Sequence, residues 1–181
     1  MTQAAATIAS QIMPLNDERV ILPNTAIAEI VSFTQPDPLP ASVKNAPKWL
    51  LGMTVWRGIS VPVIAFETML GGKFDQPGKR ARLAVLNVVG DVAGVPFIAI
   101  PTQTIPQLMQ VNQTTISVVE DSGETNPAVA CHVVVAGNTA IIPDLDEVER
   151  QVAEVFAGNA TSKKKNTSQK KSSKKKATKK K

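Results

Sequence analysis

Short apolar segments separated by polar turn residues dominate the chain up to residue 143. Most are five to nine residues long and rich in valine and isoleucine, which is typical of β-strands rather than helices. We predict strands in nine of them: residues 11–15, 18–23, 27–33, 49–56, 59–66, 82–89, 92–100, 128–136 and 139–143.

Turn signals lie between several of these segments. Asn16-Asp17 predicts a turn, and the proline-rich residues 34–48 predict an irregular connection. Residues 67–79 predict one helical turn followed by a loop. Glycine, asparagine and aspartate tolerate positive φ, so three dipeptides predict tight hairpins: Arg57-Gly58, Gly90-Asp91 and Gly137-Asn138.

One segment carries a clear helical pattern, residues 144–156. Asp144 is a suitable N-cap, and Glu147 follows at the spacing of a capping box. The apolar residues that follow share one helical face: Leu145, Val148, Val152, Val155 and Phe156. Many short strands with one terminal helix indicate a mainly β protein built from small barrels or a sandwich.

Composition divides the chain into two regions with different charge. All fifteen acidic residues lie in residues 1–156, together with nine basic ones, which gives that region a net charge of −6. Residues 157–181 hold eleven lysines and no acid. This low-complexity segment has too little apolar surface to fold alone, so we predict a domain over 1–156 and a disordered lysine-rich tail over 157–181.

The tail has three interpretations. It can be a solubilising appendage, it can bind nucleic acid through phosphate charge, or it can bind an anionic membrane surface or an acidic protein. Any such binding would be nonspecific and sensitive to salt. The residues concerned are Lys163, Lys164, Lys165, Lys170, Lys171, Lys174, Lys175, Lys176, Lys179, Lys180 and Lys181.

Residues suited to catalysis or metal binding are scarce. His132 has no second histidine to form a zinc site, and strand alternation places it opposite Cys131. A structural role for His132 is therefore favoured, and we expect no catalysis, metal or cofactor. A single cysteine fits a reducing compartment, and the chain shows neither a signal peptide nor a transmembrane segment, so we expect a cytoplasmic protein.

The segment "PKWLLGMTVWRGISVPVIAFETMLG", residues 47–71, resembles the CheW family of chemosensory coupling proteins. An apolar strand leads into Arg57-Gly58, then into an apolar stretch around Pro62, then into a short helical segment ending in glycine. "RVILPNTAIAEIVSF", "LAVLNVVGDVAGVPFIAIP" and "NTAIIPDLDEVERQV" resemble other parts of the family's fold. Within the family, the chain is most similar to the ChpC type of accessory protein in pilus-linked chemosensory systems. Trp56 stands where relatives usually have leucine.

This resemblance implies two intertwined five-stranded barrels with an apolar core between them. It also implies a non-catalytic adaptor that couples the cytoplasmic tip of a chemoreceptor to the regulatory domain of a CheA-type histidine kinase, in a pilus or twitching-motility pathway. Arg57 and Gly58 would lie beside the groove where the receptor docks, with an apolar floor of Ile30, Val31 and Val55.

The strongest alternative is a nucleic-acid- or nucleoid-associated protein whose β domain supports the lysine tail. An enzyme is a more distant alternative. Deletion of the tail separates the first two hypotheses, because a coupling protein should still bind its kinase without it.

Overall fold

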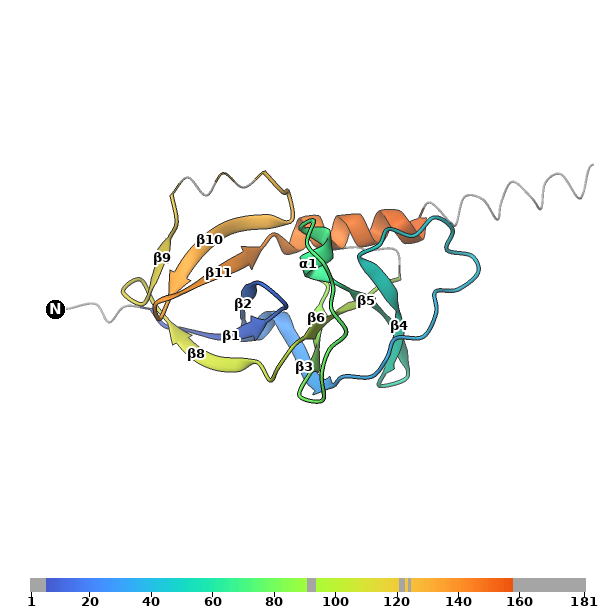
Figure 1. Cartoon of the computed structure of the whole chain (residues 1–181), viewed down its shortest axis with the longest axis horizontal. Helices are drawn as coiled ribbons and strands as arrows, with labels where there is room; N and C mark the ends of the chain where they lie inside the picture. The colour runs from blue at the N-terminus through green and yellow to red at the C-terminus, as the bar shows by residue number, and fades with distance from the viewer. Residues whose placement is uncertain (1–5, 91–93, 121–122, 124, 158–181) are drawn as a thin grey trace, which may run out of the picture.

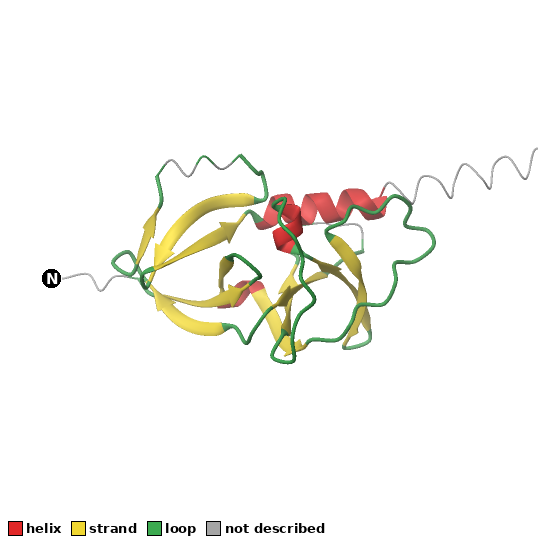
Figure 2. Ribbon diagram, viewed as in Figure 1, coloured by secondary structure: helices red, strands yellow, loops and turns green. Residues whose placement is uncertain are grey.

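The computed structural model describes residues 6–90, 94–120, 123 and 125–157. The predicted disorder of the tail and the polyanion-binding role of its lysines concern residues outside this part of the chain. The described residues form two curved β-sheets and a C-terminal helix, as the mainly β prediction required (Figures 1 and 2).

The first sheet combines strands from the two ends of the domain. Its order is β8-β1-β2-β11-β10-β9, with neighbours antiparallel except for the parallel pair β2 and β11. The strands are β1 (Ile8–Pro14), β2 (Arg19–Pro23), β8 (Gln107–Val111), β9 (Ile116–Val118), β10 (Val129–Val135) and β11 (Asn138–Pro143).

The second sheet uses the middle of the chain, so the two sheets are intertwined in sequence. Its order is β3-β6-β7-β5-β4, with β5 and β7 parallel. The strands are β3 (Ile27–Ser32), β4 (Leu50–Trp56), β5 (Ile59–Ile64), β6 (Arg82–Asn87) and β7 (Phe97–Thr102). A 3₁₀ turn, η1 (Asn24–Ala26), precedes β3, and the one-turn helix α1 (Phe66–Met69) follows β5.

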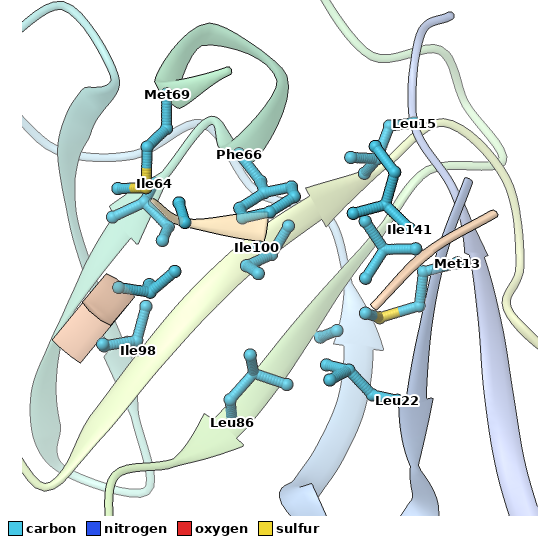
Figure 3. Close-up of a cluster of buried hydrophobic side chains, with 14 of the residues drawn as sticks. Met13, Leu15, Leu22, Ile64, Phe66, Met69, Leu86, Ile98, Ile100 and Ile141 are labelled. Carbon is cyan, nitrogen blue, oxygen red and sulfur yellow. The ribbon is translucent and has the colours of Figure 1, made fainter. Parts of the chain in front are cut away.

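Strand alternation divides the buried side chains into separate cores. On β7, Ala99 packs inside the second sheet, whereas Ile98 and Ile100 face a joint core between the sheets. Met13 and Leu22 of the first sheet reach the same joint core, which Figure 3 shows. The first sheet has a further core of its own, formed by Ile21, Val111, Val133, Val135 and Ala140.

The C-terminal helix covers residues 145–157 and extends from the end of β11 over the second sheet (Figure 1). The Asp144 side chain accepts a hydrogen bond of 3.0 Å from the Glu147 backbone N–H, which confirms Asp144 as the N-cap. The return bond of a capping box does not form, because the Asp144 N–H donates to the Ala128 carbonyl and the Glu147 carboxylate binds Arg150 and Gln151. Val148 and Val152 are buried in the joint core, with the rest of the predicted apolar stripe packed against it. The helix therefore joins the two sheets.

The structure corrects three details. Among the described residues, the first sheet has six strands where the family resemblance implied five, and neither β8 nor β9 was predicted. The turn expected at Gly137-Asn138 lies one residue earlier, because Val135 pairs directly with Asn138. The hairpin expected at Gly90-Asp91 is a longer connection, because pairing ends at Asn87 and Phe97; Asp91 itself lies outside the described residues.

No helix in the described part of the chain is both long enough and apolar enough to cross a membrane.

Candidate functional site

The β4–β5 hairpin ends in a tight turn formed by Arg57 and Gly58. Trp56 pairs with Ile59, so the loop has two residues, and their φ values are 49° and 78°. Positive φ at both positions is typical of a type I′ turn, whose twist matches that of the flanking strands. The hairpin prediction is confirmed, although arginine rather than glycine occupies the first of the two left-handed positions.

Arg57 is paired at this tip rather than free. Its Nη2 lies 2.9 Å from Glu29 Oε2, and its Nε donates to the same oxygen at 3.1 Å. The Arg57 side chain is nevertheless 69% exposed, and that of Glu29 is 39% exposed. A planar donor group therefore remains accessible to a binding partner while one carboxylate orients it.

Trp56 supports this pair from within the second sheet. Its indole Nε1 donates a 2.9 Å hydrogen bond to Glu29 Oε2, and the Arg57 guanidinium carbon lies 4.9 Å from the centre of its ring. The ring also contacts Phe97 edge to face, with centroids 4.7 Å apart. Aromatic contacts of this kind reduce the freedom of the side chains involved.

Glu29 links the two edge strands of the second sheet. It lies on β3, whereas Trp56 ends β4, and these strands are at opposite ends of the sheet order. The sheet thus curls until its edges meet at this carboxylate. The hydrogen bond from Trp56 lowers the pKa of Glu29, and the charge of Arg57 lowers it further, so Glu29 is ionised at neutral pH.

The apolar residues predicted for this site lie on different faces. Ile30 pairs with Ala84 of the joint core, whereas Val31 pairs with Leu83 of the inner core, so the two point to opposite sides of β3. Val55 lies on the outer face of β4 and is 70% exposed. Ile30 and Val55 therefore share the outer side of the second sheet, while Val31 packs within it.

Two other features bear on the predicted chemistry. His132 and Cys131 are both half-buried and adjacent on β10, and their backbones pair with β11. Among the described residues, no three histidine, cysteine, aspartate or glutamate side chains form a group that could hold a metal ion.

Comparisons with known proteins agree with this architecture. The sequence profile of the CheW-like domain matches residues 11–152. The chain belongs to the CheW-like domain family. A solved structure with the same fold is the scaffolding protein TtCheW from Thermoanaerobacter tengcongensis. It shares 15% sequence identity with this CheW-like chain and superposes with a TM-score of 0.63, over 80% of this chain and 89% of TtCheW. A search of curated protein sequences gave no match.

Within this CheW-like domain, the residue that sequence reasoning missed is Glu29. It is separated from Arg57 by 28 positions, and nothing in the local pattern around it indicates a partner. The available signal was its placement in an otherwise apolar strand, "IAEIVS", where an acid needs a donor if it is partly buried.

Proposed function

We propose that this CheW-like protein is a non-catalytic adaptor of chemosensory signalling, which couples a chemoreceptor to a CheA-type histidine kinase. The observation that carries the proposal is the accessible Arg57 guanidinium at the hairpin tip, oriented by Glu29 and Trp56, in a domain of this family. An oriented, exposed arginine can form directed hydrogen bonds with a partner's carboxylate or backbone carbonyl groups. It loses little conformational entropy on binding, because its contacts already restrict it.

The proposal extends to the signalling pathway in which the protein acts. The similarity of "VILPNTAIAEIVSF" and "APKWLLGMTVWRG" to the ChpC type supports a role as an accessory coupling protein in a pilus-linked system that controls twitching motility. The receptor tip would contact Arg57, Gly58, Ile30 and Val55 on the outer side of the second sheet. Val31 would contribute indirectly, by supporting β3 from inside.

The test uses purified full-length protein with the receptor's cytoplasmic hairpin and the kinase's regulatory domain, titrated separately. Arg57→Ala should weaken binding of one of these partners about tenfold or more, because a hydrogen bond to a charged group is lost. Arg80→Ala is the matched control, since Arg80 is exposed in the loop that follows α1. Equal affinity of wild type and Arg57→Ala for both partners would contradict the proposal.

A charge reversal tests whether the ion pair or the presented arginine matters. In the double variant Glu29→Arg with Arg57→Glu, the two side chains can pair again, but the exposed group at the tip is now acidic. Binding should remain weak if the partner recognises the guanidinium. Recovery of affinity in the double variant would show instead that the pair acts only by holding β3 against β4.

A further inference from the structure

A pocket of about 320 Å³ lies where the two sheets meet, between the β1–β2 turn and α1. The turn contributes Asp17 and Glu18, and the α1 region contributes Glu67 and the segment from Leu70 to Lys73. Arg57 and Glu29 are not among the residues that line this pocket. It is lined by three acidic side chains and one basic one.

Glu67 is the unusual member of this group. It is only 5% exposed, and neither oxygen of its shielded carboxylate has a hydrogen-bond partner. Its position follows from its neighbours, since Phe66 and Met69 anchor the single turn of α1 in the joint core. A carboxylate that is shielded from solvent and makes no well-formed hydrogen bond is unfavourable in its charged form.

The surrounding charges increase this unfavourable effect. Burial raises the pKa of Glu67, its own backbone N–H lowers that pKa in part, and the nearby charges of Asp17 and Asp75 raise it again. Lys73 contributes the one basic side chain to the pocket wall, and it is exposed. The pocket therefore has an excess of acceptors and negative charge, together with space for an additional group.

We propose that this pocket binds an organic ammonium group, which donates hydrogen bonds toward Glu67 and neutralises the charges around it. An ammonium group supplies three N–H donors on a compact cation and requires no fixed coordination geometry. A metal ion fits less well, because the described acidic side chains do not converge into a set of ligands. The ammonium group can belong to a free amine or to a lysine side chain, including one from this chain's own tail.

The experiment is an NMR titration of the full-length protein with n-butylammonium chloride, followed at the backbone amides of Gly71 and Gly72. Both glycines line the pocket. Tetramethylammonium chloride is the control ligand, because it carries the same charge but has no N–H donor. We expect a saturable shift with n-butylammonium, at least a fivefold weaker response with tetramethylammonium, and loss of the saturable shift in Glu67→Gln.

Glu120→Gln is the control variant, since it removes one negative charge from an exposed position outside the pocket. It should bind n-butylammonium as the wild type does. Equal responses to the two ligands would show simple charge screening and overturn the proposal. An unchanged titration in Glu67→Gln, or no saturable shift in the wild type, would overturn it as well.

A second arm identifies the source of the ammonium group. The eleven tail lysines are replaced by glutamine in a chain of unchanged length. If the tail occupies the pocket, the Gly71 and Gly72 resonances should move in this variant without ligand, and n-butylammonium should bind more tightly. Unchanged resonances together with unchanged n-butylammonium affinity assign the pocket to an external amine.

Discussion

Replacement of Gly52 by alanine should be among the most destabilising single substitutions in β4. A Cβ atom at this position would lie 2.2 Å from the backbone oxygen of Asp37, far inside a normal van der Waals contact. The obstacle is backbone, which cannot rotate aside as a side chain can. Gly52 also has a φ of 152°, a conformation that residues with a Cβ rarely adopt.

The size of this loss depends on how far the Asp37 backbone must move away from β4. Asp37 and Met53 exchange two backbone hydrogen bonds, of 2.7 and 2.9 Å, which hold the 33–49 connection against β4. Separating them would cost about 1–3 kcal/mol for the two bonds. The unfavourable φ would add about 1–3 kcal/mol. We therefore expect a loss of about 2–6 kcal/mol, a large part of the 5–15 kcal/mol typical of a folded domain.

Guanidinium unfolding of the full-length protein measures this loss, with tryptophan fluorescence as the signal. Trp49 and Trp56 flank Gly52, so the signal reports on the affected strand. Gly58→Ala is the matched control: its φ is 78°, but a Cβ there would meet no atom within 4 Å. It should cost about 1–2 kcal/mol. Equal destabilisation by the two substitutions would refute the close approach at Gly52.

Three further predictions concern the C-terminal region. Glu149 is 4% exposed and accepts hydrogen bonds from the Val89 and Gly90 N–H groups, so Glu149→Ala should cost about 1–3 kcal/mol in chemical unfolding and speed hydrogen exchange at both amides. The hydrogen bond from Arg150 lowers the pKa of Glu147 from 4.5 to about 2, so the Glu147–Arg150 ion pair should stabilise the fold fully above pH 4.5 and lose its effect as the pH falls toward 2. Glu147→Gln should flatten the dependence of the unfolding free energy on pH in this range, and an unchanged slope would contradict the prediction. The eleven tail lysines should bind DNA with an affinity that falls steeply between low and physiological salt. The chain with a glutamine tail should show no DNA binding in gel-shift assays, and thermal unfolding should give it the melting temperature of the wild type.

The strands that could be predicted are those with an apolar pattern strong enough to be recognised locally. On β6 four consecutive residues, Leu83 to Leu86, are buried, and the sequence shows them as a continuous apolar run. On β8 the sequence is QLMQV, and only Val111 is buried, so no alternation indicates a strand. Pairing with β1 creates β8 through backbone hydrogen bonds, which the side-chain pattern does not record.

At the candidate site, too, the sequence indicated contacts between neighbouring residues but not those between distant segments. The Arg57-Gly58 turn was predictable because the two residues that form it are adjacent in sequence. The ion pair of Arg57 could not be predicted, because Glu29 reaches Arg57 only when the second sheet curls. The burial of Glu67 was also missed, since its exposure is set by Phe66 and Met69 packing into a core that includes the first sheet.

The joint core gives the fold a property that an adaptor requires. An adaptor must present separate binding surfaces in a constant relative position, and here each sheet has its own inner core as well as a share of the core between them. Met13 of the first sheet, Phe66 of α1 and Val152 of the C-terminal helix are all essentially buried in that shared core. Moving one sheet away from the other would expose these side chains to water, at a cost of about 1.5–3 kcal/mol for each fully exposed one. This cost keeps the second sheet, with the hairpin that carries Arg57, in a fixed position relative to the strands of the first sheet.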